Sequence, residues 1–269
     1  MHGTRWLTAI FALPVLFTLI AAGGPFFFFF LILGVAGIAH TEYHRIVDTR
    51  LPSVADGELR WIARMALAFV VLSGFWGMAG LMTGLFVGLL TLIAWCMLRF
   101  GKSPELLARI PFEVQGLLWV GLPLGCLGAL RMGDHGIAWI FFTLFLVGSG
   151  DTGAYYAGRF FGKHKLAPAI SPAKTLEGFA GGIVLTLIVA LIFQLFFLSA
   201  YGLLPMLILA LITAVVAPLG DLFESMQKRV AGVKDSGRLL PGHGGMLDRI
   251  DALLFAAPAV FLLKTLFFG

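Results

Sequence analysis

Long apolar segments alternate along the chain with short segments that hold most of the polar residues. A helix that crosses a bilayer needs about 20 apolar residues, because each residue adds about 1.5 Å toward a core of about 30 Å. Helices are expected because a segment in lipid has to satisfy its own backbone hydrogen bonds. The pattern predicts an all-α fold, a polytopic transmembrane helical bundle with nine spans at residues 6–22, 25–39, 61–79, 80–98, 112–130, 136–149, 178–199, 203–220 and 250–268.

Some of these spans carry further expectations. The stretch 61–98 is one apolar run, which we divide at the small residues around Gly77, Gly80 and Gly84. The run 136–149 is short and is expected to be tilted or partly re-entrant. The beginning of the chain also resembles a signal peptide, but its apolar core is long and another span follows at once. We therefore expect the first span to be retained.

Composition supports a membrane environment. Of the 269 residues, 59% are hydrophobic and only 12% are charged, whereas soluble domains carry about 25% charged residues. This balance excludes an ordinary soluble domain. The two cysteines, Cys96 and Cys126, lie in apolar runs and are expected to pack as small hydrophobic residues.

The basic residues predict an orientation. With nine spans and a cytoplasmic N-terminus, all but two of the 19 lysines and arginines fall in cytoplasmic segments, the exceptions being Arg131 and Lys264. This asymmetry agrees with the positive-inside rule. All but one of the 14 acidic residues, Asp134 being the exception, fall on the same side. Because the rule does not concern acids, their distribution indicates a chemical site at the cytoplasmic face.

The segment before the last span carries the densest group of polar residues. Asp221, Glu224, Ser225 and Lys228 have helical spacing and can share one face of a helix that continues the preceding span. Asp248 and Asp251 are three residues apart at the start of the last span, again on one face. Two helix ends therefore bring carboxylates to the same membrane depth.

Carboxylates among basic residues indicate a divalent cation together with phosphate. Mg²⁺ prefers a few carboxylates, waters and substrate phosphate oxygens, and the expected metal ligands are Asp221, Asp248 and Asp251. The glycine-rich turn 241–245 allows the backbone to approach a phosphate closely. The residues expected to contact or neutralise a polyphosphate are Lys228, Arg229, Lys234, His243, Gly244, Gly245 and Arg249.

A second cytoplasmic segment adds further candidates. Ser171-Pro172 predicts a turn that presents Lys174 and Thr175 for nucleotide binding. The Lys-Thr pair lacks the GxxxxGK[ST] pattern and a preceding strand, which excludes a P-loop nucleoside triphosphatase. Asp151 closes an apolar span and is a third candidate for metal or nucleotide contact; pairing with Arg159 at a helix end remains the alternative.

Residues 40–64 have mixed charge, with His40, Glu42, His44 and Asp48 among them. We interpret this segment as an interfacial surface for lipid headgroups. Nothing in its pattern is specific for a reaction.

The C-terminal segment resembles the signature of the CDP-diacylglycerol synthase family, also called phosphatidate cytidylyltransferase. That signature is approximately S-x-φ-K-R-x4-K-D-x-G-x3-P-G-H-G-G-φ-x-D-R-φ-D, where φ is apolar, and residues 225–251 reproduce it at every spacing. Gln227 departs from it, because the family usually has an apolar residue there. The segments 151–155 and 171–178 are also similar to the family's pattern. The N-terminal half resembles the family only in having apolar segments of membrane-spanning length.

The resemblance implies an enzyme of phospholipid biosynthesis that joins phosphatidate to CTP, giving CDP-diacylglycerol and pyrophosphate. The resemblance implies an integral membrane enzyme that requires Mg²⁺ and forms a homodimer of many-helix subunits. The metal-binding aspartates of the family fall on Asp221 and Asp248, and Asp251 belongs to the same signature. Lys228 is expected to act with them in catalysis. We expect an inner-membrane location, an active site facing the cytoplasm and no nucleic-acid partner.

The chain is interpreted as a single integral membrane domain, 1–269. Within it, residues 1–135 form a part with weak motif content and residues 136–269 a catalytic part that carries the signature. Two alternatives remain: a related enzyme acting on another lipid, such as a polyprenol kinase or an archaeal-lipid cytidylyltransferase, and a membrane transporter.

Overall fold

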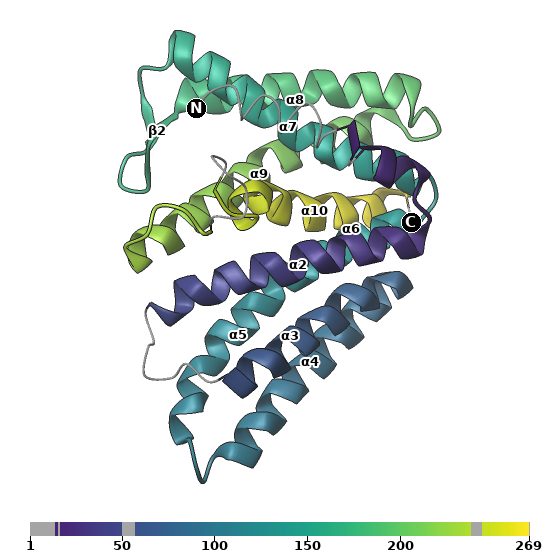
Figure 1. Ribbon diagram of the computed structural model, residues 1–269. Coiled ribbons are helices and arrows are strands. Elements are labelled where there is room, and N and C mark those ends of the chain that lie inside the picture. Colours follow the sequence, from purple (N-terminus) through teal and green to yellow (C-terminus); the bar gives the residue numbers. More distant parts are fainter. Residues whose placement is uncertain (1–13, 16, 50–56, 238–243, 269) are drawn as a thin grey trace. The chain divides into compact units, whose positions relative to one another are not determined.

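The computed structural model describes residues 14–15, 17–49, 57–237 and 244–268 (Figure 1). Helices dominate these residues, which confirms the predicted fold class. The α-helices are α2 (Pro25–Asp48), α3 (Gly57–Ser73), α4 (Gly77–Arg99), α5 (Ile110–Gly116), α6 (Leu122–Met132), α7 (Gly136–Phe161), α8 (Leu176–Phe196), α9 (Leu203–Ala231) and α10 (Leu247–Phe268). The shorter elements are the 3₁₀ turns η2 (Gly74–Trp76) and η3 (Pro104–Arg109), the π-helical turn η4 (Leu117–Gly121), and the strands β1 (Lys165–Ala167) and β2 (Ser171–Thr175).

Seven helical stretches in the described part of the chain are long and apolar enough to cross a membrane. The protein is therefore a multi-pass membrane protein. One of the seven, Gly57–Arg99, is 43 residues long and contains both α3 and α4. The predicted span 6–22 lies mostly outside the described residues, and the count of nine is not confirmed.

The division of the long run 61–98 falls where its glycines predict it. The turn η2 separates α3 from α4, and Gly77 has a φ of +66°, which disfavours other residues. A methyl group on Gly84 would collide with the hydroxyl of Ser73, so the two helices pack closely after the turn. Small residues therefore allow the turn between α3 and α4 and also the close packing of these two helices.

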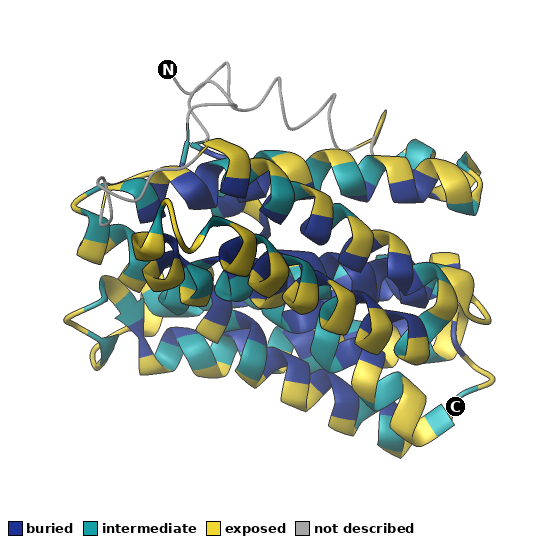
Figure 2. Ribbon diagram, turned by 90° about the horizontal axis from the view of Figure 1, so that it is seen from below, coloured by how far each residue is buried: buried dark blue, intermediate teal, exposed yellow. Residues whose placement is uncertain are grey.

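The surfaces of the helices agree with a lipid environment (Figure 2). On α4, Phe86, Met97 and Leu98 are 62%, 73% and 79% exposed. Leu195 and Phe196 on α8 are also exposed. Exposed apolar side chains in such numbers would be unfavourable in water, whereas lipid tails solvate them.

The chain divides into two compact units. Unit 1 contains Met1–Gly133 and Val230–Arg249, and unit 2 contains Asp134–Arg229 and Ile250–Gly269. The segment between α9 and α10 thus belongs with the N-terminal helices. The single-domain interpretation stays a prediction.

In unit 2, α7 and α8 pack along a line of small residues. A methyl group on Gly181 would collide with Ala157, and one on Gly182 would approach the carbonyl oxygen of Gly150. Small residues at such spacing let membrane helices approach at backbone distance. This packing fixes the position of Asp151, which lies in α7 one residue after Gly150.

A small hairpin connects α7 to α8 (Figure 1). Strands β1 and β2 pair antiparallel, with Lys165 opposite Thr175. The predicted turn at Ser171-Pro172 is wrong, because β2 begins at Ser171 and the turn lies at 168–170. Proline is tolerated at the beginning of an edge strand, where its missing N–H costs no ladder bond. The hairpin still presents Lys174 just before α8, as the sequence predicts.

Candidate active site

An ion pair between β2 and α9 lies at the centre of the candidate site in unit 2. The ammonium group of Lys174 is 2.6 Å from Oδ2 of Asp221. The hydroxyl of Ser225, one helical turn further along α9, donates a hydrogen bond of 3.3 Å to Oδ1 of Asp221. Because α9 continues to Ala231, Asp221 and Lys228 lie in the helix that extends the apolar span, which confirms the predicted helical arrangement.

Two further carboxylates lie near this pair. The charges of Asp151 on α7 and Asp251 on α10 both interact with Asp221, and that of Asp251 also interacts with Lys228. A methyl group on Gly220 would collide with the carbonyl oxygen of Asp251, so α9 and α10 touch beside the cluster. Three carboxylates from three helices therefore gather around one site.

The alternative pairing of Asp151 with Arg159 differs from what the structure shows. Helix α7 continues to Phe161, so Asp151 lies inside the helix and not at its end. The guanidinium group of Arg159 donates instead to the hydroxyl of Tyr155 at 3.1 Å. The charge of Asp151 interacts with Lys174 and Asp221.

A cavity of about 460 Å³ opens beside these groups within unit 2. Its polar wall is formed by Asp151, Tyr155, Arg159, Lys174, Thr175 and Asp221. Its apolar wall includes Leu146, Val147, Phe179, Ala214 and Pro218. A cavity with one charged wall and one apolar wall suits a ligand that carries phosphate next to hydrocarbon.

In unit 1, Asp248 at the start of α10 binds Ser236 and Gly245, which lie before and after residues 238–243 in the chain. Its Oδ2 atom accepts hydrogen bonds from the backbone N–H of Ser236 (3.0 Å), the hydroxyl of Ser236 (3.0 Å) and the backbone N–H of Gly245 (2.7 Å). Gly244 has a φ of +80°, as a tight turn requires. Oδ1 takes part in none of these three bonds. Asp251 follows Asp248 by three residues in the same helix.

The predicted phosphate-binding residues have different surroundings. Lys228 is 2.8 Å from a carboxylate oxygen of Glu224, which is fully buried. The hydroxyl of Thr175 accepts a hydrogen bond from the N–H of Gly178 and caps α8. The side chains of Arg229, Lys234 and Arg249 are exposed, and His243 lies outside the described residues. Their roles in nucleotide binding stay predictions.

Comparison with known proteins identifies the family. The model of the cytidylyltransferase family matches residues 3–267. The chain belongs to the cytidylyltransferase family. It is 34% identical over 267 residues to the phosphatidate cytidylyltransferase of Bacillus subtilis (strain 168), an alignment covering 98% of this chain and 97% of that protein.

Other relatives carry the same name. A phosphatidate cytidylyltransferase of Staphylococcus epidermidis is 35% identical over 262 residues, covering 96% of this chain and 97% of that protein. The phosphatidate cytidylyltransferase of Haemophilus influenzae is 47% identical over 128 residues, which are 46% of this chain and 44% of that protein. The resemblance inferred from the C-terminal signature is therefore confirmed as family membership.

The residues of unit 2 fit the Mg²⁺ that this family resemblance implies. Asp151, Asp221 and Asp251 are hard oxygen donors, and their mutual repulsion would be relieved by a divalent cation. Mg²⁺ typically takes one or two carboxylates and completes its shell with water and phosphate oxygens. Lys174 then offers a positive charge beside the same site.

The site residues predicted from the sequence do not include two buried acids, although Glu224 shares the predicted helix face of Lys228. Glu42, on α2, is 2% exposed and accepts hydrogen bonds from residues 236, 246 and 247. Glu224, on α9, is fully buried against Lys228. An acid four residues before a lysine is a signal for the second pair. No local pattern could reveal the first, because its partners are about 200 positions away along the chain.

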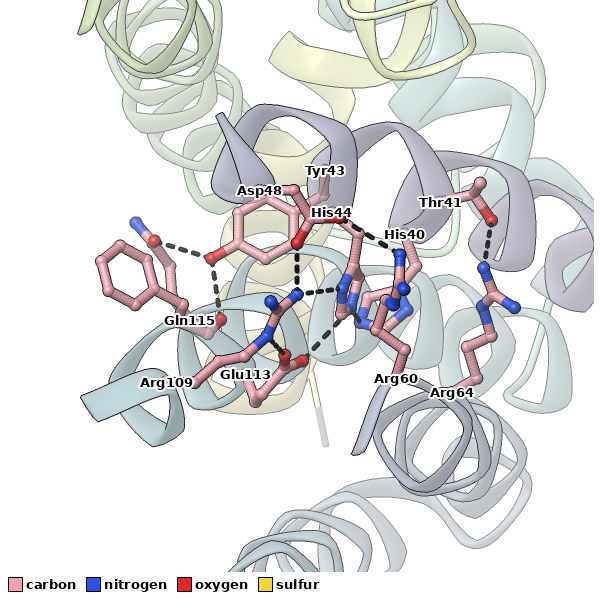
Figure 3. Close-up of polar contacts among 11 residues, drawn as sticks. His40, Thr41, Tyr43, His44, Asp48, Arg60, Arg64, Arg109, Glu113 and Gln115 are labelled. Carbon is pink, nitrogen blue, oxygen red and sulfur yellow. Dashed lines mark hydrogen bonds and ion pairs between the residues drawn. The ribbon is translucent and has the colours of Figure 1, made fainter. Parts of the chain in front are cut away.

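A second polar cluster lies in unit 1, where α2 meets η3 and α5 (Figure 3). Nε2 of His44 is 3.2 Å from Nε2 of His40 and 3.2 Å from Oε2 of Glu113. Arg109 binds Oε1 of Glu113 at 2.8 Å and Oδ1 of Asp48 at 2.7 Å. His40, His44 and Glu113 have the chemistry and spacing of metal ligands.

Arg109 argues against a metal at this cluster. Its guanidinium group has only donors, and it lies 2.9 Å from Nδ1 of His44. Nδ1 must therefore be the acceptor, and neutral His44 carries its proton on Nε2, toward His40 and Glu113. A metal would need the lone pair of that same nitrogen. We interpret the cluster as a hydrogen-bonded network that fastens α2 to α5.

This network gives a stability prediction. Arg109→Ala leaves the carboxylates of Glu113 and Asp48 without their buried partner, which typically costs about 3–5 kcal/mol. We expect a clearly lower thermal-unfolding temperature in detergent. Lys102→Ala, which removes an exposed cation a few residues earlier, is the control and should unfold like the wild type. Equal unfolding temperatures for all three proteins would show that the network contributes nothing to stability.

Proposed function

We propose that the protein transfers CMP from CTP to phosphatidate, giving CDP-diacylglycerol and pyrophosphate. The observation that carries this proposal is similarity over 96–98% of the chain to relatives named phosphatidate cytidylyltransferase. The cavity in unit 2 adds a geometry suited to both substrates. Its charged wall would hold phosphate groups, and its apolar wall would accept the beginning of the acyl chains.

The proposed chemistry is one displacement at phosphorus. An oxygen of the phosphatidate phosphate attacks the α-phosphorus of CTP, and the bond from that phosphorus to the bridging oxygen of the β-phosphate breaks. Pyrophosphate leaves with the bonding electrons. The lipid phosphate is already an anionic nucleophile, so no strong protein base is required. Positioning and charge stabilisation are what the protein has to supply.

The charged residues of unit 2 have distinct tasks in this proposal. Lys174 binds a phosphate oxygen and offsets the charge that develops on the leaving group. When bound, Mg²⁺ supplies further charge neutralisation on the triphosphate, and Asp221 and Asp251 would hold it. The ammonium group of Lys228, which is paired with Glu224, supplies a second positive charge near Asp251. In unit 1, Asp248 would hold Gly245, the last residue of the glycine-rich segment, in place.

A panel of lipids tests this function. Purified protein is given Mg²⁺ and CTP labelled in the cytosine ring, with phosphatidate, an ether-lipid phosphate of the archaeal type, or a polyprenol. We expect a lipid-soluble labelled product that forms fastest with phosphatidate. Preference for the ether lipid would assign the related cytidylyltransferase activity, and no labelled lipid with any acceptor would contradict the proposal.

We further propose that the active site faces the cytoplasm, in the inner membrane, and that the enzyme acts as a homodimer. The asymmetry of basic residues supports the orientation. A reporter fused at residue 235 is expected to be active only in the cytoplasm, and periplasmic labelling there would overturn this orientation. Cross-linking of the protein in native membranes should give a dimer band, and a purely monomeric pattern would contradict the homodimer.

A further inference from the structure

Glu42, on α2, accepts three hydrogen bonds from residues of the C-terminal signature. Its Oε2 atom accepts from the N–H of Leu247 at 2.8 Å and lies 3.2 Å from the hydroxyl of Ser236. Its Oε1 atom accepts from the N–H of Met246 at 3.1 Å. Glu42 is 2% exposed, so these bonds are shielded from water. One buried carboxylate on α2 therefore holds both described ends of the signature segment, residues 236–237 and 244–248.

The bonds of Glu42 fall at the beginning of α10. The first N–H groups of a helix have no partner within it and carry partial positive charge. Leu247 is the first residue of α10, and Met246 precedes it. A carboxylate is well suited to both N–H groups, because hydrogen bonds to an ionised acceptor are stronger than neutral ones. Glu42 thus caps α10 from a distant helix and sets where that helix starts.

Asp248 is coupled to the same arrangement through Ser236. The hydroxyl of Ser236 lies 3.2 Å from Glu42 and 3.0 Å from Asp248. Asp248 also accepts hydrogen bonds from the backbone N–H groups of Ser236 and Gly245. A shift of the Glu42 carboxylate would therefore displace Ser236 and weaken the hydrogen bonds that position Asp248.

Two glycines of the signature are explained by this contact. A methyl group on Gly237 would collide with Oε1 of Glu42. A methyl group on Gly245 would collide with Oε2 of Glu42 and with the hydroxyl of Ser236. These positions require glycine because the carboxylate approaches the backbone there. Gly245 is itself buried.

We propose that Glu42 is a positioning residue for the reaction: it fixes Ser236, residues 245–247 and, through them, the Asp248 carboxylate at the start of α10. The inference rests on the proposed function. Glu42 touches no substrate in this account and acts through the segment that it holds. A displacement of about 1 Å in a positioned group can cost about 10²-fold in rate.

The test compares Glu42→Gln with Glu105→Gln, a matched change at an exposed glutamate. The amide of glutamine keeps one acceptor oxygen and places donors against an N–H group. We expect kcat of the folded protein to fall about 10²-fold and the half-saturating Mg²⁺ concentration to rise, with the KM for phosphatidate unchanged and the unfolding temperature lowered. Glu42→Asp keeps the charge and should recover part of the rate. Glu105→Gln should behave as the wild type.

A second measurement does not depend on turnover. Hydrogen exchange of the peptide containing residues 244–248 should become faster in Glu42→Gln and stay unchanged in Glu105→Gln. If Glu42→Gln does not fold, Gly237→Ala, which keeps the carboxylate and displaces it, should show the same loss of rate and the same exchange. Wild-type kinetics with unchanged exchange, or a loss of activity explained wholly by unfolded protein, would overturn the inference. If the wild type itself transfers no CMP, the proposed function fails, while the exchange experiment still decides whether Glu42 holds the segment.

Discussion

Asp221→Asn is expected to lower kcat by about 10²- to 10³-fold, the loss seen when one charge-stabilising group is removed from an active site. Asparagine has nearly the same shape, so helix α9 should form as before. The substitution removes the negative charge that lies 2.6 Å from Lys174 and interacts with Asp151 and Asp251. We expect the half-saturating concentration of Mg²⁺ to rise, because the cation loses one of its proposed ligands.

The control for Asp221→Asn is the same change at Asp134. Asp134 also belongs to unit 2 but does not line the cavity, and it lies on the opposite side of the membrane in the predicted topology. Initial rates are measured against Mg²⁺ and CTP at saturating phosphatidate, with thermal unfolding in parallel. Wild-type rates for Asp221→Asn would remove this residue from the mechanism. Equal losses in both variants would point to a general effect of charge.

Asp248→Asn is expected to give a loss of similar size, about 10²- to 10³-fold, with membrane insertion intact. The carboxylate oxygen Oδ2 accepts three hydrogen bonds that hold Ser236 and Gly245. An asparagine side chain has one acceptor oxygen and a donor NH₂ group, so it cannot keep these bonds and also bind a cation as a carboxylate does. The glycine turn should loosen and the predicted metal contact should be lost together.

Two readouts separate these effects of Asp248→Asn. Loosening of the turn should appear as faster hydrogen exchange of residues 244–248, and loss of a metal contact as a raised Mg²⁺ requirement. A variant with faster exchange and a normal Mg²⁺ requirement would restrict Asp248 to holding the turn. Retained wild-type turnover would rule out both roles.

The elements of the fold that depend on lipid were predictable from the sequence. The length of a span is set by the bilayer, so apolar runs such as 25–39 and 203–220 have helices at their positions. The ends of helices were less predictable. Helix α7 continues to Phe161, twelve residues beyond the predicted end at 149, because glycines that usually end helices here pack against α8.

The candidate site was predictable where its residues are close in sequence. The helical spacing of Asp221 and Lys228 and the start of the last helix near Asp248 follow from local patterns. The contribution of Glu42 could not be predicted, since the segment 40–64 shows no specific pattern and the partners of Glu42 lie at the other end of the chain. The interfacial surface expected for this segment does not hold at Glu42, which is buried. The pairing of Lys174 with Asp221 likewise depends on tertiary packing.

Transfer of the cytidylyl group of CTP can be distinguished from phosphate transfer by the position of a label in CTP. Purified protein is incubated with Mg²⁺, phosphatidate and CTP carrying ³²P at either the α- or the γ-phosphate. We expect the α-label to enter the lipid and the γ-label to be released in pyrophosphate. The γ-label in lipid would indicate a kinase, and neither label in lipid would contradict the enzymatic account.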